Sequence, residues 1–227
     1  MLTQITNFNC IKKWKEYCFG AHSLYLKNPH FRKWISKKEI YIFNLSSLKI
    51  KDIRHIKSGL EDAIRLAKLH FKVFYGDIGN FKKIINSGNK KISSAKLLKA
   101  VIEERKKNHK EPASIFVFNN PIKSQDSVIE DGEALTYVAE GATIFSFDAF
   151  KHYPPSFLMR RGKHETLHLL GLNSHHENTK VKGYNKGYKH NVSCNMNYNA
   201  PTQNLCRKCR DGLIYFWRGL RYATENR

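Results

Sequence analysis

The segment His164-Glu165-Thr166-Leu167-His168 constrains this chain more than any other stretch of its sequence. It falls within a predicted helix over about 154–170, and Gly171 follows where a glycine commonly ends a helix. Residues four apart on a helix project from one face, one turn apart. The rings of His164 and His168 can therefore reach one ion, and zinc binds imidazole nitrogen at about 2 Å. The spacing predicts that both histidines are ligands of a single zinc ion.

Glu165 places a carboxylate directly beside this ligand pair. Zinc lowers the pKa of a water to about 7, and a nearby carboxylate can take the proton as that water attacks a carbonyl. The same carboxylate can then deliver a proton to the leaving amine. We therefore expect Glu165 to be the general base and acid of peptide-bond hydrolysis.

The residues after His168 resemble the metzincin metallopeptidase motif HExxHxxGxxH, in which three histidines bind the catalytic zinc. Gly171 matches the glycine, which can turn the chain sharply through a positive φ. The third histidine of the motif falls on Ser174, whose hydroxyl competes poorly with imidazole for zinc. We expect His175 to be the third ligand, through a turn that is one residue longer. The alternative is His176.

Two downstream motifs, C-x-M over 194–196 and C-x-x-C over 206–209, resemble those of the archaemetzincins, a family of metzincins. In that family, these cysteines and one directly after the third histidine bind a second, structural zinc. A histidine is an ordinary substitute for a cysteine at such sites. The chain departs from the family in having seventeen residues between His176 and Cys194. The resemblance implies a structural zinc with four ligands: His176, Cys194, Cys206 and Cys209.

The resemblance also implies a role for the methionine of the C-x-M motif. Met196 corresponds to the residue of the Met-turn, which lies beneath the catalytic ion in this family. Tyr198 follows two residues later, where some metzincins place a tyrosine that binds zinc or stabilises an oxyanion. Because Tyr184 and Tyr188 lie in the same tyrosine-rich stretch, we favour coincidence for Tyr198.

The strand and helix signals predict an α/β (α+β) fold, with helices packed on a mixed sheet. Ser58 and Glu61 form a candidate capping box for the first helix. The resemblance implies a metzincin-like twisted sheet with a small, irregular, zinc-stabilised C-terminal subdomain. We expect a basic, aromatic N-terminal appendage over 1–38, a catalytic domain over 39–212 and a C-terminal helix or tail over 213–227. The catalytic domain divides into an upper part, 39–171, and a lower zinc-binding part, 172–212.

The predicted elements are strands over 39–50, 71–78, 113–120, 135–139 and 142–147, and helices over 59–71, 94–110 and 154–170.

The net charge of +21 is unevenly distributed along the chain. Residues 1–110 hold 25 Lys and Arg against 8 Asp and Glu. A basic half of this kind can attract nucleic acid or another polyanion. A solvated, lysine-rich surface is the simpler interpretation, since no nucleic-acid-binding motif accompanies the charge.

The cysteines and the N-terminus bear on the compartment. Five cysteines are an odd number, and no signal peptide precedes them, so we expect reduced thiols. No stretch approaches the roughly 18 consecutive apolar residues of a membrane helix. These features predict a cytoplasmic protein that does not enter a membrane.

Together these features predict a zinc-dependent metallopeptidase with two zinc ions, one catalytic and one structural. Its substrate is a peptide or protein, which we expect to lie along the strand pair around 134–147. The alternative is a zinc-stabilised, nucleic-acid-associated binding module with weak or lost peptidase activity.

Overall fold

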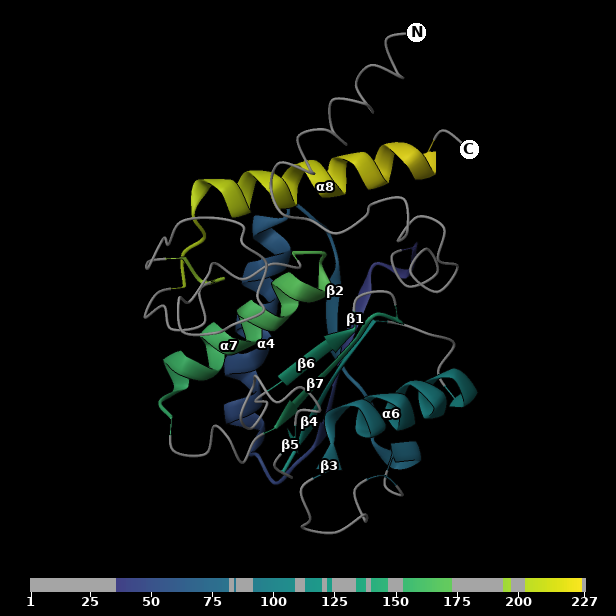
Figure 1. The fold of residues 1–227 in the computed structure, drawn as a ribbon. Helices are drawn as coiled ribbons and strands as arrows, with labels where there is room; N and C mark the ends of the chain where they lie inside the picture. The colour runs from purple at the N-terminus through teal and green to yellow at the C-terminus, as the bar shows by residue number, and fades with distance from the viewer. Residues whose placement is uncertain are drawn as a thin grey trace, which may run out of the picture.

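A mixed five-stranded sheet organises the molecule (Figure 1). Its strand order is β2-β1-β4-β7-β6; the first four are parallel, and β6 is an antiparallel edge strand. The strands are β1 (Glu39–Leu45), β2 (Lys72–Tyr75), β4 (Ala113–Phe118), β6 (Ala134–Tyr137) and β7 (Ala142–Ser146). Two short strands, β3 (Ile92–Ser93) and β5 (Ile122–Lys123), pair separately. The computed structural model describes residues 36–81, 84, 92–108, 113–119, 122–123, 134–137, 140–146, 153–172, 194–196 and 203–225.

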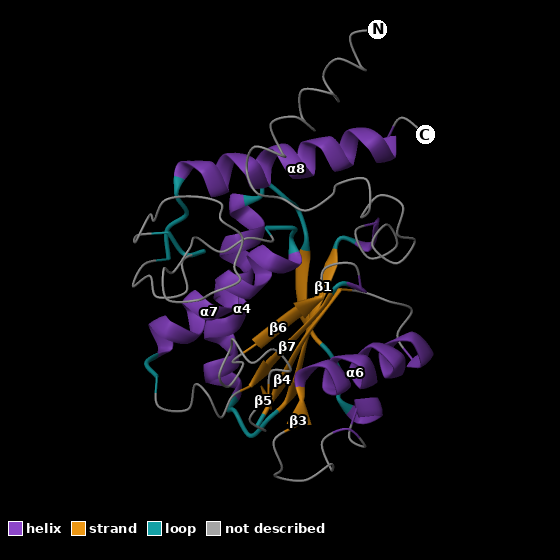
Figure 2. Ribbon diagram, in the orientation of Figure 1, coloured by secondary structure: helices purple, strands orange, loops and turns teal. Residues whose placement is uncertain are grey.

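Helices cover both faces of the sheet (Figure 2). On one face lie α4 (Ile50–Leu66) and α7 (Pro155–Leu169); on the other lies α6 (Ser94–Asn108). The remaining helical elements are α8 (Arg207–Glu225) and a 3-10 turn, η1 (Gly79–Phe81). Strands β4 and β7 are buried along their whole length, as expected for parallel strands covered on both faces. The predicted α/β class and mixed sheet are confirmed.

The start of α4 is the main error of the sequence-based prediction. The helix begins at Ile50, so Ser58 lies in its middle, and the Ser58 hydroxyl donates to the carbonyl of Arg54 at 2.9 Å. The predicted capping box is therefore wrong. Ile53 and Ile56 are both buried and extend the apolar face of the helix upstream, so core packing decides where it begins.

The first strand is also shorter than predicted, and a local turn explains its end. The strand stops at Leu45 rather than at residue 50. The Asn44 side chain accepts from the Ser46 backbone N–H at 3.2 Å and donates to the carbonyl of Leu48 at 2.9 Å. These bonds to the Asn44 side chain replace the hydrogen bonds that the backbone would otherwise make to a neighbouring strand, so β1 ends here.

Helices α4 and α7 cross with their backbones in contact, which fixes the position of α7. A Cβ on Gly59 would lie 2.2 Å from the Met159 carbonyl oxygen, and one on Gly162 would lie 2.7 Å from the Ile56 carbonyl oxygen. Only glycine permits this approach. Beside the crossing, the buried Lys163 ammonium of α7 pairs with the Asp62 carboxylate of α4.

Helix α8 packs against the C-terminal end of α7. The Trp217 indole N–H donates to the carbonyl of Leu170 at 2.8 Å, and its ring meets Phe71 edge-on, 5.5 Å away between centroids. The helix starts at Arg207, on the N-terminal side of the predicted boundary at 212. Most of the predicted appendage, 1–38, lies outside the described residues, and the division into three parts stays a prediction. No helix among the described residues is long and apolar enough to cross a membrane.

Candidate metal centre

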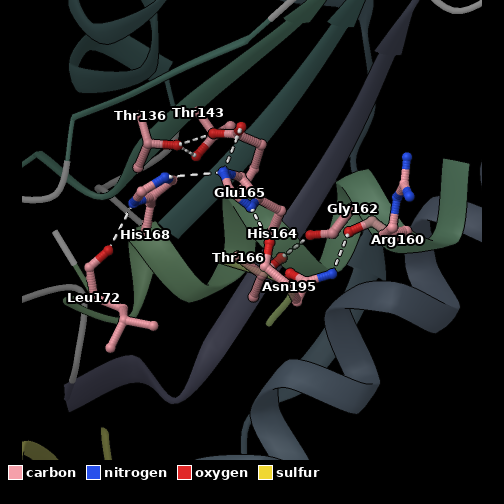
Figure 3. Close-up of polar contacts among 10 residues, drawn as sticks. All are labelled: Thr136, Thr143, Arg160, Gly162, His164, Glu165, Thr166, His168, Leu172 and Asn195. Carbon is pink, nitrogen blue, oxygen red and sulfur yellow. Dashed lines mark hydrogen bonds and ion pairs between the residues drawn. The ribbon is translucent and has the colours of Figure 1, made fainter. Parts of the chain in front are cut away.

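Two histidines of α7 face each other at the sheet side of the helix (Figure 3). His164 and His168 are both buried, and their Nε2 atoms lie 3.2 Å apart. Two nitrogens bound to one tetrahedral zinc at about 2.0–2.1 Å lie about 3.3 Å apart. The separation therefore matches that of two ligands of one zinc ion.

The opposite nitrogen of each ring is held by a backbone carbonyl. His164 Nδ1 lies 2.7 Å from the Asn195 oxygen, and His168 Nδ1 lies 2.6 Å from the Leu172 oxygen. A carbonyl only accepts, so each Nδ1 carries the proton, and in the neutral ring each Nε2 carries a lone pair. Two such lone pairs 3.2 Å apart are placed to bind one cation together. Carbonyls in this role are the usual outer partners of metal-binding histidines.

The end of α7 places the Leu172 carbonyl beside His168. The Leu172 N–H donates to the carbonyl of Leu167 at 2.9 Å, and the Gly171 N–H donates to that of His168 at 2.8 Å. These are the two bonds of a Schellman motif. Gly171 has the positive φ of 102° that the motif requires, and a Cβ there would meet the Phe216 ring at 2.6 Å. The predicted role of Gly171 as the turn residue is confirmed.

The Glu165 carboxylate lies beside the Nε2 atoms of the histidine pair. Its Oε1 lies 4.0 Å from His164 Nε2, and its Oε2 accepts a hydrogen bond from the Thr136 hydroxyl at 2.9 Å. The side chain is 11% exposed, so little water competes for these atoms. A carboxylate 4.0 Å from a ligand nitrogen can exchange a proton with a molecule that is bound between the carboxylate and the two histidines.

Three cysteines form a second cluster of candidate ligands. The sulfurs of Cys194, Cys206 and Cys209 all lie within 4.8 Å of one another. Hydrogen bonding to Cys194 and Cys206, together with burial, raises the pKa of the Cys209 thiol well above its usual value. Three crowded sulfurs lose their protons together only beside a cation, and zinc is the usual ion of such sites. The donor set therefore fits zinc.

Residues 194–196 connect the two clusters. Cys194 belongs to the sulfur cluster, while the carbonyl of Asn195 holds the ring of His164. Met196 is fully buried in the main core, and its role as the Met-turn residue stays a prediction. The Asn195 N–H donates to the carbonyl of Asn204 at 2.6 Å, which ties this short segment to the residues before α8.

Several predicted site residues fall outside the part of the chain that the structure describes. These are His175, His176 and Tyr198. The choice of third catalytic ligand, the fourth structural ligand and the role of Tyr198 therefore stay predictions. Conversely, sequence reasoning missed Thr136, which contacts Glu165, and the carbonyl of Asn195. No sequence motif marks either of them.

Sequence comparison and structural comparison give different results. No family model matches the sequence, and neither does any curated protein sequence. An archaemetzincin from Methanopyrus kandleri superposes with a TM-score of 0.52 at 10% identity, covering 81% of this chain and 95% of that one. The chain has the archaemetzincin fold. A zinc-dependent peptidase from Methanocorpusculum labreanum shares this fold, with a TM-score of 0.50 at 19% identity, covering 77% of this chain and 99% of that one.

The superposition confirms the fold that the sequence motifs implied. A resemblance carried by a few residues between 164 and 209 thus extends to the architecture of most of the chain. At these identities the likeness concerns the fold, so any activity depends on the geometry of the metal centre itself.

Proposed function

We propose that this protein is a zinc-dependent peptidase whose catalytic ion is held by His164, His168 and, as third ligand, His175. The observation that carries the proposal is the pair of Nε2 atoms at 3.2 Å, each ring oriented by a carbonyl, with the Glu165 carboxylate 4.0 Å from His164 Nε2. The names of the two solved structures with the same fold support it, one being a zinc-dependent peptidase and the other an archaemetzincin.

Zinc in such a site supplies an acidified water and polarises the carbonyl of the scissile bond. The residues of the chain supply the rest. Glu165 accepts a proton at Oε1, the oxygen nearer to the ligand pair, and returns it to the nitrogen of the leaving amine. Because the imidazoles and the carboxylate are buried, the charges that develop during the reaction are weakly screened.

Strand β6 offers a place for an extended substrate. Within the described residues it pairs only with β7, so its other edge is available for a further strand. An extended peptide can add there through backbone hydrogen bonds. Thr136 lies on this strand and contacts Glu165, so a peptide bound along the edge lies close to the metal centre. The proposed substrate is therefore a peptide or protein segment in extended conformation.

We further propose a second, structural zinc held by Cys194, Cys206, Cys209 and His176. The three sulfurs support this, and His176 rests on the resemblance alone. The prediction that the protein binds nucleic acid or another polyanion is supported only by the positive charge of residues 1–110, and it stays a prediction. The cytoplasmic location also stays a prediction.

Removal of the metal tests the proposed activity. The zinc-loaded protein is expected to cleave members of a mixed peptide library, to lose this activity on dialysis against a chelator, and to regain it when zinc is added. Mass spectrometry of the digest measures the cleavage, and magnesium in place of zinc is the control. Cleavage that continues at full rate in the metal-free protein would exclude a zinc peptidase.

A further inference from the structure

Two threonine hydroxyls and the Glu165 carboxylate form a continuous chain of hydrogen bonds (Figure 3). Thr136 of β6 and Thr143 of β7 are directly opposite each other in the antiparallel pair. Their hydroxyl oxygens lie 2.9 Å apart, and the Thr136 hydroxyl lies 2.9 Å from Glu165 Oε2. The chain thus crosses from the inner strand to the edge strand and then to the metal-binding helix.

The chain has a fixed direction. An ionised carboxylate only accepts, so the single proton of the Thr136 hydroxyl is donated to Glu165. That leaves Thr136 as the acceptor from Thr143, whose side chain is fully buried. A hydroxyl that accepts one bond is a better donor in the next, so Thr143 strengthens the contact between Thr136 and Glu165.

The contact distinguishes the two oxygens of Glu165. Thr136 holds Oε2 toward the sheet, which leaves Oε1 on the side of the metal ligands, 4.0 Å from His164 Nε2. Without the hydroxyl, the carboxylate is free to rotate about its terminal bond, since such torsions are broad. The hydroxyl therefore selects the orientation in which Oε1 faces the ligands.

The two residues directly before β7 are themselves held in place. Arg105 of α6 is buried, and its guanidinium donates to the carbonyl oxygens of Gly141, at 2.8 Å, and Glu140. These bonds anchor the residues that precede β7 and so maintain the register that sets Thr136 opposite Thr143. A slip of β6 by one residue would turn the Thr136 hydroxyl to the other face of the sheet, away from Thr143, which the pairing of β7 with β4 holds in place.

We propose that Thr136 is a positioning residue for Glu165, oriented in turn by Thr143, and that the edge strand available to a substrate also holds the catalytic carboxylate. The part that concerns catalysis rests on the proposed peptidase activity. The physical coupling of Thr136 to Glu165 does not depend on it.

Removal of the hydroxyl tests the catalytic part. Thr136→Val keeps the shape of the side chain and is expected to lower kcat about 10- to 100-fold, with KM and zinc content unchanged. Thr136→Ser restores the hydroxyl and is expected to recover most of kcat. The control is Ser58→Ala, which removes a hydroxyl of α4 whose exposed hydrogen bond goes to the Arg54 carbonyl instead. An unchanged kcat in Thr136→Val, or a serine variant as slow as the valine variant, would overturn the proposal.

A double-mutant cycle in the zinc-loaded protein tests the coupling without an activity assay. Thr136→Val is expected to lower the urea midpoint of unfolding more when Glu165 is present than in the Glu165→Ala background, because the loss of the hydrogen bond to Thr143 is common to both. Equal shifts in both backgrounds would refute the coupling. If the cycle shows coupling while no variant or parent cleaves peptides, the proposed function fails and the positioning of Glu165 by Thr136 stands.

Discussion

Replacing Glu165 with glutamine is expected to abolish peptide cleavage and to leave the zinc content of the protein unchanged. Glutamine has nearly the same shape, and its side-chain carbonyl can still accept the hydrogen bond from Thr136, so the structure around α7 persists. Its amide cannot take up a proton at neutral pH. General acid–base catalysis contributes about 10²- to 10⁴-fold to rates, and kcat/KM is expected to fall by at least that much.

Two measurements decide this result. Peptide cleavage gives kcat/KM, and elemental analysis gives the zinc bound per chain, which separates loss of the base from loss of the metal. Glu61→Gln is the matched control, because that carboxylate lies on α4 with 54% of its side chain exposed. A Glu165→Gln variant that retains zinc and cleaves peptides at the parent rate would show that Glu165 is not the base.

Replacing Cys209 with serine is expected to cost the protein its structural zinc and much of its stability. Structural zinc sites contribute about 10–16 kcal/mol of binding free energy to folding at pH 7. A hydroxyl is a poor zinc ligand, so we expect the free energy of unfolding to fall by about 5 kcal/mol or more. The effect is expected to reach the catalytic site, because Cys194 precedes Asn195, whose carbonyl orients His164.

The measurements are zinc per chain and the midpoint of urea unfolding. The variant is expected to bind about one zinc where the parent binds two, and to hold that remaining ion more weakly. Cys10→Ser provides a control, since Cys10 belongs to neither motif. Parent-like stability and full zinc content in Cys209→Ser would rule out a structural zinc at the three sulfurs.

The sequence predicted most of the elements that carry the site because their signals are local. Helix α7 follows from two prolines, a helical stretch and Gly171, and the histidine spacing fixes which side chains share a face. Strands β4 and β7 follow from runs of β-branched and aromatic residues. Each of these depends on neighbours along the chain.

The contacts that complete the site could not be predicted, because they join residues distant in sequence. Thr136 meets Glu165 only through the register of β6 on β7 and the packing of α7 on the sheet. The Asn195 carbonyl is a backbone group, which no residue type reveals. The capping box at Ser58 failed for the same reason: a local pattern competed with the packing of Ile53 and Ile56 in the core.

The most direct test of the metal centre is an anomalous-scattering map of the crystallised protein, recorded at the zinc absorption edge. We predict one peak about 2 Å from the Nε2 atoms of both His164 and His168, with His175 as the third ligand. A second peak is expected among the sulfurs of Cys194, Cys206 and Cys209. A zinc-supplemented crystal with no peak between His164 and His168 would contradict the proposed catalytic zinc site.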